Sequence, residues 1–386
     1  MNLDGGYSEG GGQIVRNGAS YSAILQQPLT ISNIRKNRPS PGLKNQHLTG
    51  IRLVNEICNG QLQGDELNSI RIHLSPSLLK PAGSRFLADA KTAGSICLMI
   101  QVSFPVLLFC PPTTETNPRK ETRTQQLVLK GGTDVSNSPP IDYICNVFNP
   151  MFARLFCSGK THCRINVDRR GYMPKGGGQV TMNIESLKPG EYLSPAILLE
   201  RGSVVRIKGR IVTGGRTDLA VALNLKKFVL ENLQKSEYGH IKTLDEDIQV
   251  AYEPECYGSG SSINLLAETS TGCLFGGGAL GGSKRALEKT ANEACEELLR
   301  NLRHGGCVDE FLQDMIVIFV ALAKGKSQVV TGPLTSHTTT AFYVAKAMTG
   351  VDFSYHRLPT VEGTEHDADQ QERYLIECEG IGYIMS

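Results

Sequence analysis

The chain has 386 residues and a formal net charge of +2, and 40% of its residues are hydrophobic while 20% are charged. This length allows two or three domains, and the composition is ordinary for a soluble globular protein that needs no disulfides to fold. The eleven cysteines include no Cys-x-x-Cys pair, which excludes the common zinc and dithiol redox motifs. We interpret them as small apolar residues of a reducing compartment.

The longest apolar stretch, residues 96–110, is interrupted by Gln101, Ser103 and Pro105. It is also shorter than the ~20 residues that a membrane helix requires. The opening residues, MNLDGGYSEGGG, are acidic and glycine-rich instead of basic and then apolar, so they lack the pattern of a secretory signal. We therefore expect a soluble, intracellular protein with no membrane partner.

Positive charge is concentrated in the first 50 residues, whose local net charge is +3. A concentrated basic patch suits a compact anion, such as a nucleoside triphosphate or the end of a nucleic acid strand, whereas a DNA duplex needs basic residues that are spread more widely. We therefore expect no duplex DNA partner. The basic residues are Arg16, Arg35, Lys36, Arg38 and Lys44, against the acidic residues Asp4 and Glu9.

Helix-like and strand-like patterns alternate in the first hundred residues. The stretch SIRIHLS places Ile70, Ile72 and Leu74 at every second position, which is typical of a half-buried strand. These patterns predict a small α/β unit with helices on one side of a sheet. The predicted order is helix 13–27, strand 28–37, helix 47–60 and strand 69–75.

A similar succession of helix-like and strand-like patterns follows, which indicates an internal repeat. The sequence similarity between EGGGQIV and KGGGQVT is short and adds little support. Residues 111–126 are polar and contain prolines, which predicts a loop. Near Glu200 the pattern becomes strand-rich, and we predict an inserted α/β domain over 200–305 in a main domain of 1–199 and 306–386. The predicted elements are helix 91–101, strands 105–110 and 126–132, helix 141–156, a strand after the turn at 174–180, strands 203–212, 261–269 and 271–278, and helix 286–306.

Two common nucleotide-binding motifs are absent. Gly10-Gly11-Gly12 is followed by Val15 where a dinucleotide fingerprint requires a small residue, and no clear strand precedes it. In GGALGGSK, Ser283 separates the last glycine from the lysine, so the segment is not a P-loop. If ATP binds, another scaffold must hold it.

Several polar residues lie in otherwise apolar or glycine-rich segments. Glu9 and Arg16 are two helical turns apart, with a glycine loop between them that permits close approach of a ligand. Arg35 and Arg38 precede a proline turn, where two guanidiniums could form a bidentate clamp for an anion. His337 is a lone imidazole in TGPLTSHTTT, and by itself such a residue is more often structural than catalytic.

Taken together, these segments resemble the RNA 3'-terminal phosphate cyclase family over nearly the whole chain. The least similar parts are residues 111–126 and the predicted inserted domain. The matching segments occur in the order of the family: DGGYSEGGGQIVR, IRKNRPSPGLKNQHL, KTAGSICLMIQ, LKGGTDVSNSPPIDY, RGYMPKGGGQV, LRHGGCVDEFLQD and TGPLTSHT.

The resemblance implies a main domain of three repeated units, each with two helices and a four-stranded sheet, and a smaller inserted α/β domain. It also implies a ligase that uses ATP, with Mg²⁺ or Mn²⁺, to convert an RNA 3'-phosphate end to a 2',3'-cyclic phosphate through a covalent histidine-AMP intermediate. His337 matches the nucleophile of the family. Eukaryotic members are largely nuclear, so the nucleus is the expected location.

The resemblance also assigns the remaining site residues. Arg16 and Arg38 match residues linked to activity, and Glu9 matches the metal-associated carboxylate. Phe311 replaces a common tyrosine and so keeps a stacking face without the hydroxyl, while Ser336 stands where a larger apolar residue or a cysteine is frequent. Residues expected to bind ATP or its phosphates are Arg35, Gln46, Gln101, Pro139, Tyr143, Phe311 and Asp314.

Two alternatives stay open from the sequence. A cyclase-like branch of the family acts in ribosome assembly and lacks the nucleophilic histidine, so this chain could be a binding factor of that kind. The same fold also carries enolpyruvyl transferases, and architecture alone does not exclude that chemistry. The segment around His337 favours adenylate transfer.

Overall fold

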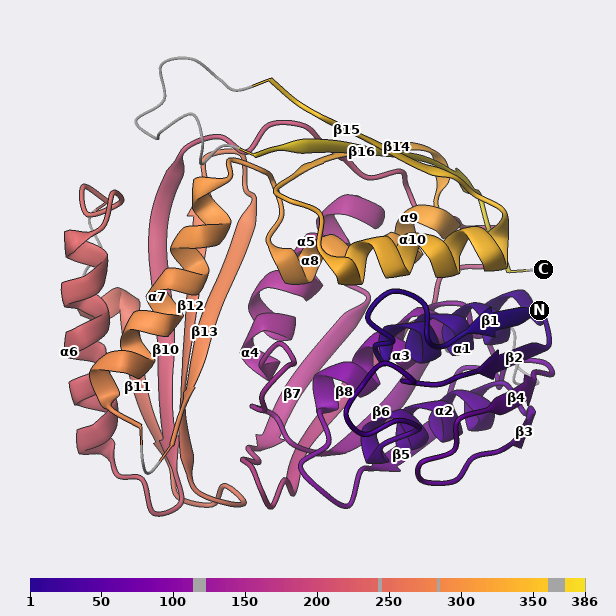
Figure 1. Cartoon of the computed structure of the whole chain (residues 1–386), viewed down its shortest axis with the longest axis horizontal. Coiled ribbons are helices and arrows are strands. Elements are labelled where there is room, and N and C mark those ends of the chain that lie inside the picture. Colours follow the sequence, from indigo (N-terminus) through magenta and orange to yellow (C-terminus); the bar gives the residue numbers. More distant parts are fainter. Residues whose placement is uncertain (114–122, 242–244, 283–284, 360–371, 386) are drawn as a thin grey trace.

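A computed structural model describes residues 1–113, 123–241, 245–282, 285–359 and 372–385. Its described residues form four four-stranded sheets with helices between and around them (Figure 1). Among these residues, no helix is both long and apolar enough to span a bilayer. The fold is mixed α/β, as the sequence predicts.

The first sheet has the strand order β1-β2-β4-β3. Strands β1 and β2 are parallel, so the chain must cross over between them, and α1 makes this crossover. The other two pairings are antiparallel. The elements are β1 (Asn2–Asp4), α1 (Gln13–Leu25), β2 (Leu29–Ser32), α2 (Asn45–Ile57), β3 (Gln61–Gln63) and β4 (Ile72–Ser75).

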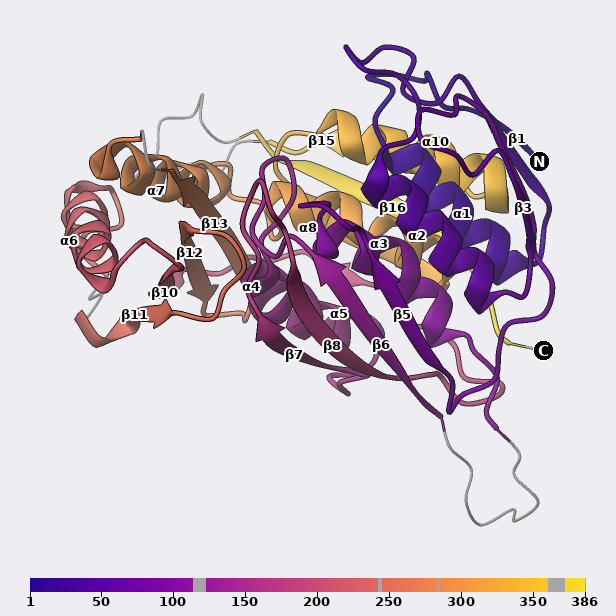
Figure 2. The ribbon, with the colours of Figure 1, turned by 90° about the horizontal axis from the view of Figure 1, so that it is seen from below.

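The second sheet repeats this arrangement, with the order β5-β6-β8-β7, one parallel pair and two antiparallel pairs. Figure 2 shows its four strands side by side. Its elements are β5 (Arg85–Asp89), α3 (Ile96–Leu108), β6 (Thr124–Gly131), α4 (Ile141–Tyr143), the π-helical η1 (Ile144–Phe148), α5 (Asn149–Phe156), β7 (Cys163–Arg169) and β8 (Gly178–Glu185).

The third sheet has the same order again, β9-β14-β16-β15, with β9 and β14 parallel. Three sheets with one strand order confirm the predicted three-unit architecture. Its first strand is far from the others in sequence, because the fourth sheet intervenes. The elements are β9 (Ile197–Leu198), α8 (Glu310–Met315), α9 (Val317–Leu322), β14 (Lys324–Thr331), α10 (Ser336–Thr349), β15 (Phe353–Arg357) and β16 (Tyr374–Ile381).

The fourth sheet, ordered β11-β10-β12-β13, lies between β9 and α8 in the sequence. Helices α6 and α7 cover one of its faces, and the other face lies toward α4 (Figure 1). The exact limits of the inserted domain stay a prediction. The elements are β10 (Val204–Gly214), α6 (Leu219–Lys235), the 3-10 helix η2 (Asp245–Asp247), β11 (Ile248–Glu253), β12 (Gly260–Thr269), β13 (Leu274–Gly281) and α7 (Leu287–Arg303).

The predicted strand at 105–110 is wrong, because α3 continues through Pro105 to Leu108. A short apolar run fits a buried helix as well as a buried strand, and α3 is buried along nearly its whole length. Its start is also later than predicted, at Ile96, where the Ser95 side chain accepts a hydrogen bond from Leu98 N and caps the helix. Much of the predicted loop at 111–126 lies outside the described residues.

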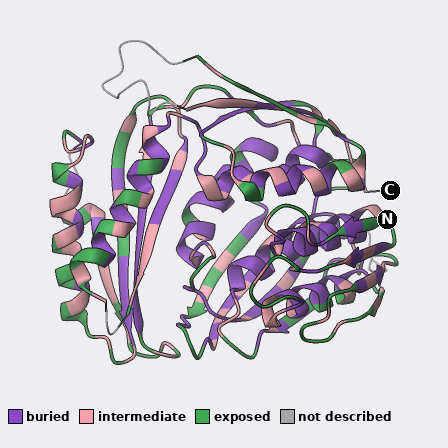
Figure 3. Ribbon diagram, viewed as in Figure 1, coloured by how far each residue is buried: buried purple, intermediate pink, exposed green. Residues whose placement is uncertain are grey.

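A buried ion-pair network joins the second unit to the fourth sheet. The Arg170 side chain is 1% exposed and contacts Asp142 at 2.6 Å, Asp134 at 3.1 Å and Glu253 of β11 at 3.1 Å. Figure 3 shows that α4 and α5 of the second unit and the strands of the fourth sheet contain many buried residues. A buried guanidinium is stable only when carboxylates pair with it, so these contacts fix the position of the fourth sheet.

We expect Arg170→Met to lower the free energy of unfolding by about 3–5 kcal/mol, because it leaves two buried carboxylates without their cation. Denaturant titration measures this change. The matched control is Arg164→Met on β7, where the side chain is exposed, and we expect a change within about 0.5 kcal/mol. Equal effects of the two substitutions would contradict the structural role of the network.

Candidate active site

The Glu9 carboxylate lies between two predicted site residues. Its Oε2 is 2.9 Å from Nη2 of Arg38, and its Oε1 is 3.3 Å from Nδ1 of His337. Glu9 and Arg38 belong to the first unit, whereas His337 is the second residue of α10 in the third unit. The structure thus brings together residues that are more than 320 positions apart in the sequence.

The first turns of α1 continue this cluster. Gln13 Nε2 donates a hydrogen bond to Asp314 Oδ2 at 2.7 Å, which links α1 to α8. Burial lowers the pKa of the Arg16 guanidinium to about 10, while the negative charges of Asp314 and Glu9 oppose this shift. Burial raises the pKa of the Asp314 carboxyl, and the nearby His337 is the largest opposing influence.

Three buried polar atoms in this cluster have no hydrogen-bond partner among the described residues: Glu9 Oε1, Gln13 Oε1 and Arg16 Nε. Buried polar atoms in folded proteins are nearly always satisfied. Their concentration within eight residues of the chain therefore indicates a place where a polar ligand or solvent completes the hydrogen bonding.

His47, near the start of α2, lies against the glycine loop that precedes α1. Its Nδ1 accepts a hydrogen bond from Lys44 N at 3.1 Å, and its Nε2 lies against Gly12, where a Cβ would come within 2.2 Å of this nitrogen. Burial, followed by the charges of Arg16, Arg35 and Lys44, lowers the pKa of His47 to about 3. His47 is therefore neutral, and only glycine fits at position 12.

The turn that precedes α10 and His337 is held by the side chain of Gln313, which is 2% exposed. Its Oε1 accepts hydrogen bonds from Thr335 N at 3.0 Å and from the Thr338 hydroxyl. Its Nε2 donates to the Thr331 hydroxyl and to Pro333 O. This amide thereby joins α8 to both sides of the turn before α10. It fixes the N-terminus of α10, while His337 itself is 49% exposed.

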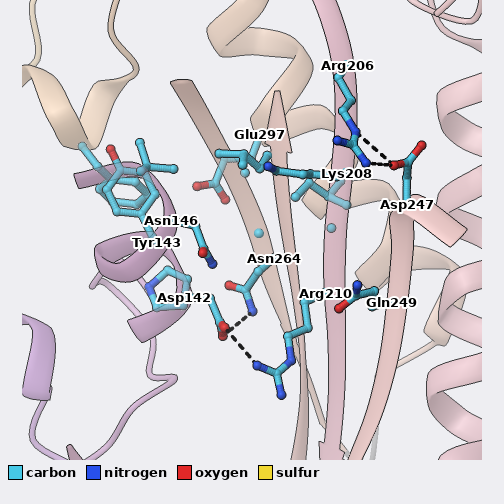
Figure 4. A pocket seen from close by; sticks show the side chains of 18 of the residues that line it. Asp142, Tyr143, Asn146, Arg206, Lys208, Arg210, Asp247, Gln249, Asn264 and Glu297 are labelled. Carbon is cyan, nitrogen blue, oxygen red and sulfur yellow. Dashed lines mark hydrogen bonds and ion pairs between the residues drawn. The ribbon is translucent and has the colours of Figure 1, made fainter. Parts of the chain in front are cut away.

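Tyr143 and Phe311 lie together, with ring centroids 5.4 Å apart in an edge-to-face arrangement. The Tyr143 hydroxyl donates to Oδ1 of the fully buried Asp309 at 2.6 Å, and burial raises the pKa of Asp309 to about 6. Both rings line a cavity of about 290 Å³ between α4 and the fourth sheet (Figure 4). Such a wall of aromatic rings suits a flat apolar group.

Arg35 and Gln101 are two further residues that the sequence predicts for the site. Arg35 donates to the carbonyls of Ser40 and Gly42, and burial and the charge of Arg38 lower its pKa. Gln101 lines a small cavity with Gln13 and Asp314.

Gln46 and Pro139 are connected through the start of α3. Gln46 Oε1 accepts from Ser95 N at 3.1 Å, and the Ser95 hydroxyl is 2.5 Å from that of Ser138, which donates to Pro139 O. These local contacts explain the placement of both residues, and a ligand role for them stays a prediction.

Comparison with known proteins identifies the family. The sequence model of the family described as RNA 3'-terminal phosphate cyclase matches residues 7–355. The chain belongs to this family. The "Probable RNA 3'-terminal phosphate cyclase" of Dictyostelium discoideum is 38% identical, over 100% of this chain and 83% of that protein. The RNA 3'-terminal phosphate cyclase of Drosophila melanogaster is 30% identical, over 100% of this chain and 97% of that protein.

A third relative is similar over nearly the whole length of both chains. The RNA 3'-terminal phosphate cyclase of Pyrobaculum aerophilum is 34% identical over 99% of both chains. The cyclase family assignment predicted from the sequence motifs is thus confirmed.

Residues that the sequence did not indicate are Gln13, His47, Asp309 and Gln313. Gln13 directly follows the glycine loop, and Gln313 lies between Phe311 and Asp314. Their proximity in sequence to these predicted site residues was the feature that could have indicated them. Their roles depend on contacts between distant segments, and a single sequence does not contain this information.

We expect Gln313→Met, which keeps the side-chain length but removes the hydrogen bonds, to loosen the turn before α10. Loss of this buried amide should lower the free energy of unfolding by about 1–3 kcal/mol and accelerate amide exchange in residues 331–340, measured by hydrogen-exchange mass spectrometry. Gln328→Met, on the half-buried side of β14, is the control. Unchanged exchange in residues 331–340 would refute this role.

Proposed function

We propose that this chain is an ATP-dependent RNA 3'-terminal phosphate cyclase with His337 as its nucleophile. The observation that carries the proposal is the contact of His337 with Glu9 beside Arg16 and Arg38, in a place with several unsatisfied polar atoms. The names of the relatives support the same activity.

The geometry of His337 suits an attack on phosphorus. Its Nδ1 lies 3.3 Å from the Glu9 carboxylate, which favours the tautomer with its proton on Nδ1 and leaves the lone pair of Nε2 for the attack. Nε2 attacks the α-phosphorus of ATP, the bond from this phosphorus to the bridging oxygen breaks, and pyrophosphate leaves. The new imidazolium phosphoramidate carries positive charge, which Glu9 stabilises.

Two further transfers complete the reaction. An oxygen of the RNA 3'-phosphate attacks the phosphorus of the histidine-bound AMP, and the P–N bond breaks and returns the electron pair to the imidazole. The adjacent 2'-hydroxyl then loses its proton to water, and its oxygen attacks the activated 3'-phosphorus. AMP leaves, and a 2',3'-cyclic phosphate remains.

Arg16, Arg35 and Arg38 supply positive charge where these transfers develop negative charge on phosphoryl oxygens. A divalent ion, Mg²⁺ or Mn²⁺, would neutralise charge on the pyrophosphate group. Among the described residues, no group of three or more His, Cys, Asp and Glu side chains could hold a metal. Apart from the 3.3 Å contact with His337 Nδ1, Glu9 Oε1 has no partner among the described residues, so it can act as one ligand, and a magnesium ion commonly takes its others from phosphates and water.

The adenine of ATP would lie against Tyr143, Phe311 and the Pro139 segment. Gln101 and Gln46 would contact the nucleotide from α3 and α2. Gln313 would act as a positioning residue, because it fixes the N-terminus of α10 from which His337 projects.

The alternative is a non-catalytic cyclase-like factor in ribosome assembly, which requires no nucleophile. The exposed imidazole of His337 beside Glu9 favours the catalytic function, and transfer of label from ATP separates it both from this alternative and from enolpyruvyl transfer. A nuclear location stays a prediction.

We expect the protein to become labelled by ATP that carries radiolabel in its α-phosphate, with Mg²⁺ or Mn²⁺ present, and the adduct to be acid-labile and comparatively stable to base. His337→Ala should abolish labelling without unfolding the protein, because the side chain is half exposed. His356→Ala, on the exposed strand β15, is the control. Labelling of His337→Ala at the wild-type rate would show that the nucleophile lies elsewhere.

An RNA with a 3'-phosphate on a terminal 2'-deoxy sugar should be adenylated and then stall. The 2'-hydroxyl is the nucleophile of the last step, and its proximity makes that step effectively unimolecular. Mass spectrometry should detect AMP on the stalled oligonucleotide, whereas the ordinary substrate should yield a phosphatase-resistant end. Joining of two RNA ends, or internal cleavage without ATP, would exclude cyclase chemistry.

A further inference from the structure

The fourth sheet presents basic side chains toward the rest of the molecule. Arg206, Lys208 and Arg210 alternate along β10, so they lie on one face, about 6.6 Å apart along the strand. This face is opposite to α6 and α7, and all three residues line the cavity shown in Figure 4. The catalytic steps proposed above use none of them.

This cavity continues into two others. The neighbouring cavity of about 240 Å³ shares Pro140, Asn264, Glu297 and Phe311 with it. The third cavity, of about 870 Å³, shares Ser136, Leu280 and Arg285 with the second and also contains Arg216. Together the three form one groove, here called the β10 groove, between the fourth sheet and the segments around residues 134–147 and 172–174.

The groove is larger than one nucleotide requires. Its three parts of about 290, 240 and 870 Å³ together exceed the ~300–1,000 Å³ that is typical of a small-ligand pocket. Tyr143 and Phe311, the rings proposed above to contact adenine, line the first cavity, and Phe311 lies where this cavity meets the second, while Arg216 lines the third. A chain molecule that enters at Arg216 and ends near Phe311 would fill this space.

Several acidic residues of the groove are already paired with cations or bound to backbone. Asp134 and Asp142 pair with the buried Arg170, and Asp247 accepts a hydrogen bond from Arg206 at 3.0 Å. Asp218 caps α6 by accepting from Val221 N.

In the part of the chain that the structure describes, some cationic groups of the groove have no acidic partner or only a distant one. Within the described residues no ion pair involves Lys208 or Arg216, and Arg210 lies 3.4 Å from Glu253 and 3.9 Å from Asp142. Burial, followed by the charge of Glu310, raises the pKa of Glu297 to about 7, so this acid is partly uncharged at neutral pH. Glu246 also lines the groove, so the cations that it offers to an anionic chain are those of Lys208 and Arg216.

We propose that the β10 groove binds the single-stranded RNA that leads to the 3'-phosphate, with Lys208 near the terminus and Arg216 several nucleotides away. The inference rests on the proposed function, because it takes RNA as the substrate. Sequence-independent binding of single strands commonly relies on a basic groove that follows the backbone. Such contacts would hold an RNA end of any sequence in reach of His337.

The test measures RNA binding directly, by fluorescence anisotropy of 5'-labelled oligoribonucleotides with a 3'-phosphate, of about 3 and about 12 nucleotides. Lys208→Ala and Arg216→Ala should each weaken binding of the longer RNA about fivefold. Each should also reduce the slope of log affinity against log salt by about 0.7. With the shorter RNA, Arg216→Ala should have no effect.

The matched control is Lys227→Ala, on the exposed side of α6 at the opposite face of the sheet, and it should bind both RNAs as the wild type does. Affinity that is unchanged in both groove variants would overturn the proposal. So would a raised KM for ATP in the RNA-free labelling of Lys208→Ala, because Lys208 would then bind the nucleotide and not the RNA. Binding needs no catalysis, so failure of the wild type to label with ATP would refute the proposed function and leave this test intact.

Discussion

The position of the Glu9 carboxylate is the constraint on which the site depends. Its two oxygens contact Arg38 and His337, and its charge helps to offset the cost of burying Arg16. Desolvation alone would disfavour a buried guanidinium. Charged groups of the first and third units therefore meet at this point, beside the packed helices α1 and α10.

Glu9 and His337 meet where α1 of the first unit packs against α10 of the third unit. Glu9 lies in the loop before α1, which joins the parallel strands β1 and β2, and His337 is the second residue of α10, which follows β14. Hydrogen bonds between Gln13 and Asp314 and between Gln313 and the turn before α10 then fix the relative positions of α1, α8 and α10. Rigid elements surround a reactive residue that itself stays accessible.

Much of the fold was predictable from periodicity, including α1, α2, β4 and α7. The error at residues 105–110 arose because α3 is buried along nearly its whole length and therefore lacks a polar face. Glu9, Arg38 and His337 were identified through motif order, and their contact now adds geometry to those assignments. Gln313 and His47 could not be found in this way, since their significance lies in hydrogen bonds and burial that only the folded chain creates.

Buried and exposed groups have different roles in this site. Gln313, His47 and Asp309 are nearly or fully buried, and each holds backbone or an aromatic ring in place through hydrogen bonds. His337, in contrast, is half exposed. A nucleophile that must meet ATP and then transfer AMP to an RNA end needs this access, and solvation of its surroundings reduces the electrostatic strength of each contact. Fixed donors and cations around the imidazole compensate for this loss, because they require no rearrangement when charge develops.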